Sequence, residues 1–159
     1  MTVAMSTITL RPAGPADEGF LLAVYASTRA DELALVDWSD AQKKAFVHQQ
    51  FTAQSAHYRD YTGASYDVIE VDGEPTGRLY VARWEDEIRI MDIALLPEHR
   101  GAGIATRLLG ELLAEGAEAG KKVSIHVERQ NPARGLYERL GFVPVEERGV
   151  YLLLEARPT

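Results

Sequence analysis

A glycine-rich turn joins an apolar, strand-like run to an amphipathic, helix-like run in the middle of the chain. The stretch reads ALLPEHRGAGIATRLLGELL, residues 94–113, and its turn holds Gly101 and Gly103. Glycine lets the backbone approach a ligand closely, and the first N–H groups of a helix favour negative charge. The turn therefore predicts an anion site, with phosphate as the expected ligand. The alternative is a tight connection in which the glycines serve geometry alone.

Apolar periodicity on both sides of the turn predicts the remaining elements. Alternating runs bounded by turn residues predict strands, and helical spacing of apolar side chains predicts helices. The predicted strands cover residues 8–11, 66–71, 78–84, 87–95 and 123–128, with a closing hairpin over 142–155. The predicted helices begin near residues 17, 39, 103 and 131. This order indicates the α/β class (α+β type), with a mixed, mostly antiparallel sheet flanked by helices.

Length and composition narrow the class of protein further. A chain of 159 residues suits one domain, so we predict a single domain over residues 1–159. The net charge of −7 comes from acids spread along the chain, which argues against nucleic acid as a partner. The chain has no cysteine, and its four histidines lack a metal-ligand spacing, so no metal is expected. With no membrane-length apolar run and no signal-like start, we expect no membrane partner and a cytoplasmic location.

Two other kinds of phosphate site differ from this turn in spacing. A nucleoside-triphosphate loop needs Lys and then Ser or Thr after its last glycine, whereas Ile104 and Ala105 follow Gly103. A dinucleotide fingerprint is closer, because GAGIAT supplies two of its small residues and Glu128 ends the next predicted strand. Thr106 replaces the third small residue, however, and too little chain follows for a doubly wound sheet. A dinucleotide-binding protein therefore stays the weaker alternative.

The stretch 94–113 resembles motif A of the GNAT acetyltransferases, which runs Arg or Gln, two residues, Gly, one residue, then Gly or Ala. Arg100, Gly103 and Ala105 fill that pattern. A second stretch, NPARGLYERLGF, resembles the downstream block of the same family, and its matching residues are Asn131, Tyr137, Gly141 and Phe142. Two motifs in the right order are more specific than one, and the resemblance is strong over residues 87–142.

The resemblance implies a GNAT-like fold whose sheet is splayed between the strands 87–95 and 123–128, with acetyl-CoA bound there. The pyrophosphate would lie on the turn formed by Arg100, Gly101, Ala102, Gly103, Ile104 and Ala105. The pantetheine arm would pair like an added strand with Ile93, Ala94 and Leu95. A bulge near residues 91–93 would help the strands to separate. Asn131 and Arg134 complete the expected cofactor contacts, although Arg134 departs from the family's usual Ala and also fits a solvated helix charge.

Acetyl transfer to an amine needs a base, because a lysine-like amine with a pKa near 10.4 is protonated at pH 7. Glu87 lies at the spacing from Arg100 where some members of the family place their base, and it also fits a solvated turn acid. Asp92 lies among apolar residues of the same strand, where an acid should be paired or have a perturbed pKa. Asp92 therefore fits either a base or a satisfied bulge acid.

The family analogy assigns the remaining chemistry. It points to the Leu95 N–H as the donor for the developing oxyanion and to Tyr137 as the acid that protonates the departing thiolate. A buried core tyrosine is the alternative for Tyr137. On the acceptor side, Glu32, Asp37 and Trp38 suit a cationic amine through charge and cation–π attraction, and they equally suit surface acids and a packing Trp.

The sequence thus predicts an acyl-CoA-dependent N-acyltransferase that uses acetyl-CoA and no metal. Its acceptor would be a small-molecule or peptide amine that attacks the thioester directly, and the acceptor itself stays open because fold does not fix substrate. Family members are often dimers, so a homodimer is one expected state. The competing class is a CoA-binding module without turnover.

Overall fold

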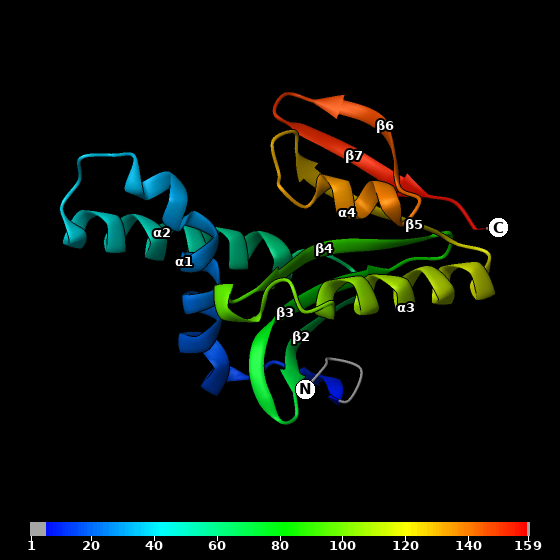
Figure 1. Cartoon of the computed structure of the whole chain (residues 1–159), viewed down its shortest axis with the longest axis horizontal. Helices are drawn as coiled ribbons and strands as arrows, with labels where there is room; N and C mark the ends of the chain where they lie inside the picture. Colours follow the sequence, from blue (N-terminus) through cyan, green and yellow to red (C-terminus); the bar gives the residue numbers. More distant parts are fainter. Residues whose placement is uncertain (1–5, 159) are drawn as a thin grey trace. The chain divides into compact units, whose positions relative to one another are not determined.

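A computed structural model describes residues 6–158, and Figure 1 labels its elements. Over these residues the strands form one seven-stranded sheet in the order β1-β2-β3-β4-β5-β7-β6. The strands are β1 (Ile8–Pro12), β2 (Ala64–Val71), β3 (Glu74–Arg83), β4 (Glu87–Leu95), β5 (Lys122–Glu128), β6 (Val143–Arg148) and β7 (Tyr151–Ala156). The helices are α1 (Glu18–Ala34), α2 (Asp40–Arg59), α3 (Ile104–Ala119) and α4 (Arg134–Arg139), with short 3-10 turns at Pro15–Asp17 and Pro97–His99. The predicted order of strands and helices is confirmed.

The pairing of the strands also agrees with the predicted mixed, mostly antiparallel sheet. β1 pairs antiparallel with β2, and β7 pairs antiparallel with both β5 and β6. β4 and β5 run parallel, because α3 crosses over between them. β4 and β5 thus form a parallel pair within a mostly antiparallel sheet, and the glycine-rich turn follows the end of β4.

Contacts along the chain group it into two compact units. The first holds the residues up to Tyr61 together with Tyr66–Leu79 and Ala94–Ala102, and the second holds Thr62–Ser65, Tyr80–Ile93 and Gly103–Thr159. Boundaries fall inside the strands β2, β3 and β4 and in the glycine-rich turn between Ala102 and Gly103. The single domain that the sequence indicates over residues 1–159 stays a prediction.

The first unit packs α1 and α2 around a small apolar core. Its buried side chains are Leu21, Tyr25, Val47, Phe51 and Val68. The rings of Tyr25 and Phe51 lie 6.0 Å apart in a tilted arrangement. At the start of α2, Ser39 accepts a hydrogen bond from the N–H of Gln42 and so caps the helix that the sequence predicted to begin near residue 39.

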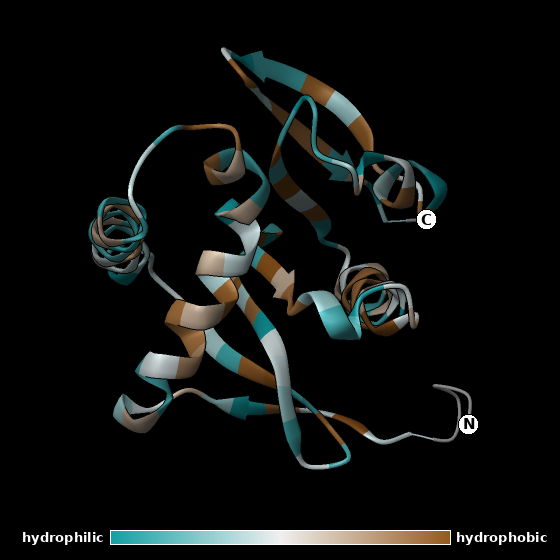
Figure 2. Ribbon diagram, turned by 60° about the vertical axis from the view of Figure 1, so that its left-hand side comes forward, coloured by the Kyte–Doolittle hydropathy of each residue, from teal (hydrophilic) through white to brown (hydrophobic). Residues whose placement is uncertain are grey.

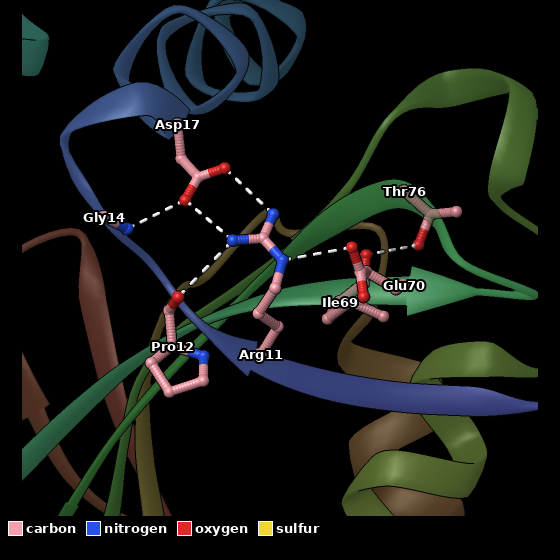
Figure 3. Close-up of polar contacts among 7 residues, drawn as sticks. All are labelled: Arg11, Pro12, Gly14, Asp17, Ile69, Glu70 and Thr76. Carbon is pink, nitrogen blue, oxygen red and sulfur yellow. Dashed lines mark hydrogen bonds and ion pairs between the residues drawn. The ribbon is translucent and has the colours of Figure 1, made fainter.

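An arginine clamp fastens the start of α1 to β1 and β2 in the first unit (Figure 3). Arg11 donates to both carboxylate oxygens of Asp17 at 2.9 Å and to Glu70 at 3.1 Å. The same Asp17 accepts a hydrogen bond from the N–H of Gly14 at 2.8 Å. The hydrogen bonds from Arg11 and Gly14 lower the pKa of Asp17 to about 2. The clamp thus uses a carboxylate that stays ionised well below neutral pH.

The second unit places the apolar side of its strands beneath α3. Alternate residues of β5 are buried, namely Val123, Ile125 and Val127, and bands of hydrophobic and hydrophilic residues follow one another along the strands in Figure 2. α3 approaches this surface at Gly116, where an added Cβ would lie 2.9 Å from Val123 Cγ2 and 2.8 Å from the Lys121 oxygen. Glycine is therefore needed at position 116 for close packing.

The described residues contain neither a helix that could span a membrane nor a cluster of metal-ligating side chains. No helix within residues 6–158 is long and apolar enough to cross a membrane. Over the same range, no group of three His, Cys, Asp or Glu side chains is placed to hold a metal ion.

Candidate active site

The glycine-rich turn leaves space at the start of α3. Gly101 has φ 76° and Gly103 has φ 84°, and L side chains rarely adopt this left-handed region. A Cβ added at either glycine would meet nothing within 4 Å, so the glycines serve backbone conformation while the surrounding space stays open. α3 begins at Ile104, and the Gly103 carbonyl accepts the N–H of Arg107 at 3.0 Å. The first N–H groups of α3 have no helical partner and can bind an anion.

The end of β4 lies directly before this turn and is held from two sides. The guanidinium of Arg100 turns back and donates to the Leu95 carbonyl at 3.0 Å, and the Leu96 N–H donates to the Thr76 carbonyl at 2.9 Å. A Cβ on Gly77 of β3 would overlap the Ala94 carbonyl oxygen and come within 2.9 Å of a Leu95 methyl group. Gly77 therefore sets the position of the strand segment proposed to pair with pantetheine. Gly77 was not among the predicted residues, because its neighbours become visible only when β3 and β4 are placed side by side.

The strands β4 and β5 separate part-way along their length. Their paired residues run from Glu87 with Lys122 to Ile90 with Ile125 in the described chain. Beyond this point β5 continues to Glu128 in pairing with β7, while β4 continues to Leu95. The predicted splay is thus confirmed, and the bulge near residues 91–93 stays a prediction.

The charge of Asp92 acts on Tyr137 in the second unit. Tyr137 on α4 is only 4% exposed, and its ring packs edge-on against Phe142 at 5.7 Å. Burial, together with the charge of Asp92, raises the pKa of Tyr137 to about 12. The hydroxyl therefore remains protonated at neutral pH and is available as a donor. Asp92 is half-buried, as its apolar neighbours in the sequence predicted.

Glu87, the other candidate base, is bound by several partners at the start of β4. It accepts a short hydrogen bond from the Ser124 hydroxyl and another from Arg89 at 3.0 Å, and Lys122 lies 3.9 Å away. Burial acts to raise the pKa of Glu87, but the hydrogen bonds from Ser124 and Arg89 outweigh it and hold the pKa below its usual value. The oxygens of Glu87 are thus engaged by these partners, which argues against Glu87 as a free proton acceptor.

Asn131 and Arg134 support the segment that leads into α4. The Asn131 side-chain oxygen accepts the N–H of Ala133 at 2.8 Å. Arg134 donates to the Arg129 carbonyl at 3.0 Å and pairs with Glu138 at 3.5 Å. Both residues therefore hold the local backbone that carries Tyr137, and a contact of either with CoA remains a proposal.

The residues predicted for the acceptor side lie at the end of α1 and in the loop before α2. Glu32 pairs with Arg29 at 3.1 Å. Trp38 is 43% exposed and meets the ring of Phe46 edge-on at 5.4 Å. Asp37 is exposed, and so is Leu35, which was not among the predicted residues. The loop therefore offers both apolar surface and negative charge.

The model of the acetyltransferase (GNAT) family matches residues 31–142, which is more than half of the chain. The chain belongs to the GNAT family. The resemblance seen in the two sequence motifs is thus confirmed.

Two curated relatives of this GNAT protein have related names. The [ribosomal protein bS18]-alanine N-acetyltransferase of Haemophilus influenzae is 39% identical over 67 residues, which cover 42% of this chain and 46% of that protein. A Bacillus subtilis protein that provisionally bears the same name is 32% identical over 106 residues, 64% of each chain. The matched region thus spans about half the length of the first relative and just under two thirds of the second.

The solved structures agree on the fold. The PaiA N-acetyltransferase of Thermoplasma acidophilum, in complex with coenzyme A, superposes with a TM-score of 0.71 and 16% sequence identity. The superposition covers 95% of this chain and 99% of that protein. At this level of identity the likeness establishes the GNAT fold.

Proposed function

We propose that this GNAT protein transfers the acetyl group of acetyl-CoA to an amine by direct attack of the amine on the thioester. The observation that carries the proposal is the open turn at the start of α3, with two left-handed glycines directly after the end of β4. The turn amides from Arg100 to Ala105 would bind the pyrophosphate. Ile93, Ala94 and Leu95 would pair with the pantetheine arm and extend it toward the separation of β4 and β5.

The transfer step requires that a neutral amine reach the thioester carbonyl. As the amine nitrogen attacks, the new C–N bond forms, and Asp92 takes the amine proton directly or through a water molecule. The Leu95 N–H would stabilise the negative charge on the carbonyl oxygen. The C–S bond then breaks and CoA leaves as a thiolate, which finally takes up one proton. Amine and acetyl-CoA are thus converted to amide and CoA.

Tyr137 would assist the departure of CoA chiefly as a hydrogen-bond donor. Its pKa of about 12 lies above that of an ordinary thiol, which is about 8.5. Complete transfer of the phenolic proton to the thiolate is therefore uphill, whereas a hydrogen bond to the thiolate is favourable. The same raised pKa keeps the donor proton in place at any physiological pH.

For the acceptor we propose the N-terminal α-amine of a polypeptide. The names of the two curated relatives, which specify an alanine of a ribosomal protein, support this class of acceptor and with it a cytoplasmic location. An α-amine has a pKa of about 7.7 to 8.0, so a substantial fraction is neutral near pH 7.5, whereas a lysine amine is almost wholly charged. The neutral fraction of such an amine can attack the thioester at once, and Asp92 then has only to take the proton released in the transfer step.

A pair of matched peptides tests this proposal. One peptide has a free N-terminal alanine and no lysine, and the other has the same sequence with a blocked N-terminus and one added lysine. We expect release of CoA thiol with the first peptide and little with the second. Acetylation of the lysine peptide alone would overturn the choice of acceptor. Binding of acetyl-CoA without transfer to either peptide or to small amines would favour the CoA-binding module without turnover.

A homodimer is a further proposal. Val143 and Val145 of β6 are 54% and 49% exposed, and Val150 and Tyr151 of the same hairpin are also exposed. β6 stands at the edge of the sheet order, where a second copy could cover these side chains. Sedimentation of the purified protein at several concentrations tests this state, and a monomer at all of them contradicts it.

A further inference from the structure

His126 lies on β5 at the point where β4 and β5 separate. The last pair between the two strands is Ile90 with Ile125, so His126 is the next residue of β5. From there β5 continues to Glu128 in pairing with β7. The side chain of His126 is exposed. The histidine therefore stands at the opening in which the proposed acetyl transfer would take place.

His126 shares one face of the sheet with Arg89. Successive side chains of a strand point to opposite faces, and Val123, Ile125 and Val127 are buried on one of them. His126 therefore lies on the other face, together with Ser124. The register places Arg89 of β4 opposite Ser124, so Arg89 belongs to this face as well.

The helices α3 and α4 cover the opposite face. α3 connects β4 to its parallel neighbour β5, and α4 connects β5 to β6, which runs parallel to β5 on the far side of β7. Both connections move in the same direction across the sheet. Such crossovers are right-handed, which puts both helices on one side. In agreement, Leu113 of α3 and Leu140 at the end of α4 line one depression together with Val123. An acceptor can thus approach on the face of His126 while Tyr137 acts from the helix side.

Arg89 fixes the protonation of the His126 ring. Its Nη1 lies 3.3 Å from His126 Nδ1. A guanidinium can only donate, so Nδ1 accepts and the ring proton of the neutral imidazole is on Nε2. Arg89 is itself held by hydrogen bonds to Ser124 at 2.7 Å and Glu87 at 3.0 Å, and it lies 5.3 Å from the centre of the Trp84 ring. Nε2 makes no hydrogen bond within residues 6–158.

We infer that the Nε2–H of His126 is a specificity determinant that donates a hydrogen bond to the acceptor, at the backbone carbonyl beside the α-amine. This inference rests on the proposed function. An N-terminal residue carries a carbonyl on the carbon next to the amine-bearing one, and a simple alkylamine does not. The donor would therefore select peptide termini and orient the amine for attack. Glu87 then has a positioning role, because it accepts a hydrogen bond from Arg89 and so keeps Arg89 beside His126. This role is separate from that of a base.

The charges around His126 keep the imidazole neutral. Partial shielding of the ring from water lowers the pKa of His126 below its ordinary value, and the charges of Arg89 and Arg148 lower it further. The charges of Glu146 and Glu87 act in the opposite direction. Protonation of Nδ1 would remove the hydrogen bond from Arg89 and with it the fixed orientation of the ring. Because the pKa of His126 is lowered, we expect the KM for the neutral form of the peptide amine to stay constant down to the ordinary histidine pKa of about 6.5 and to rise only at lower pH.

Two substitutions at His126 separate donation from other roles. His126→Gln keeps an N–H near the position of Nε2, whereas His126→Leu removes it. One lost hydrogen bond is worth about tenfold, so we expect kcat/KM for an N-terminal alanine peptide to fall about tenfold in His126→Leu and less than about threefold in His126→Gln. With an alkylamine of similar size that lacks the carbonyl, both variants should match the wild type. His48→Leu, a change at an exposed histidine of α2, serves as the matched control.

The outcomes are distinct. A loss in His126→Gln as large as in His126→Leu, most marked at low pH, would mean that the imidazole is a base and would overturn the inference. Equal activity of all variants with the peptide would also overturn it while leaving the proposed function intact. If the wild type acetylates alkylamines but no peptide terminus, the proposed acceptor fails and the inference fails with it. Thermal unfolding of each variant with and without acetyl-CoA shows whether the fold and cosubstrate binding are unchanged.

Discussion

The sharpest structural prediction concerns the same change, Gly to Ala, at three positions with different surroundings. At Gly77 the added Cβ would overlap the Ala94 carbonyl oxygen and lie 3.0 Å from Leu95 Cα, both of which belong to the neighbouring strand. At Gly116 it would lie 2.8 Å from the Lys121 oxygen. At Gly110, inside α3, it would meet nothing within 4 Å. The three sites therefore separate crowding from the general effect of replacing glycine.

The expected magnitudes follow from these contacts. Overpacking against backbone atoms costs about 1 to 3 kcal/mol, so Gly77→Ala and Gly116→Ala should each lower the free energy of unfolding by roughly that amount. In a helix with free space, Ala is favoured over Gly by about 1 kcal/mol, so Gly110→Ala should stabilise the protein. Gly77→Ala should in addition weaken acetyl-CoA binding, because β4 must shift at the residues proposed to bind pantetheine. Gly116→Ala should weaken it less.

Urea unfolding of the four proteins measures stability, and calorimetry with acetyl-CoA measures affinity. Gly110→Ala is the control for both measurements. If Gly77→Ala proved as stable as Gly110→Ala, the close approach of β3 to the end of β4 would be refuted. Stability lost in Gly77→Ala with unchanged affinity for acetyl-CoA would leave the packing correct and remove Ala94 and Leu95 from the proposed cosubstrate site.

Three further predictions concern the proposed chemistry and the Arg11 clamp. Asp92→Asn should lower kcat most at neutral pH and less at high pH, because the amine is already neutral at high pH. Glu87→Gln should leave the shape of the pH profile of kcat unchanged. The reverse pattern would make Glu87 the base. Tyr137→Phe should lower kcat about tenfold to a hundredfold with acetyl-CoA affinity nearly unchanged, and near wild-type turnover would make Tyr137 a core residue only. The pKa of Asp17 falls from 3.8 to about 2 on folding, so its contribution to stability is present above pH 3.8 and is lost as the pH falls toward 2. The difference in unfolding free energy between wild type and Asp17→Asn should accordingly be constant near neutrality and shrink across that window; a constant difference down to pH 2 would contradict the clamp.

Local patterns in the sequence were sufficient for the order of the elements and for the turn. Hydrophobic periodicity depends on near neighbours, and Gly101 and Gly103 mark the turn without any knowledge of the rest of the fold. The two 3-10 turns and the early start of β3 at Glu74 were missed. The start of β3 depends on pairing with the neighbouring strands, whereas each 3-10 turn is too short to show the apolar periodicity by which a helix is predicted.

Contacts between distant segments could not be predicted from the sequence alone. Glu87 was proposed as a base from its spacing to Arg100, but its partners Ser124 and Lys122 come from a strand more than thirty residues later. Gly77 has an ordinary backbone conformation, and its requirement for glycine arises from the neighbouring strand. The hydrogen bond from Arg11 to Glu70 likewise depends on the pairing of β1 with β2. In each case the missing information is a tertiary neighbour.

We propose that the turn at Gly103 holds the phosphates of acetyl-CoA while the acetyl group is transferred. A charge placed at this turn should therefore abolish both acetyl-CoA binding and acetyl transfer, and both can be measured on the same two proteins. Wild type and Gly103→Asp are incubated with acetyl-CoA and a peptide with a free N-terminal amine, and mass spectrometry follows the peptide while a second sample gives the affinity for acetyl-CoA. The substitution adds a side chain at φ 84° and a negative charge beside the start of α3. With the wild type, we expect the peptide to gain one acetyl group. We expect Gly103→Asp to fold but to lose both acetyl-CoA binding and acetyl transfer. Unchanged binding and transfer by folded Gly103→Asp would contradict it.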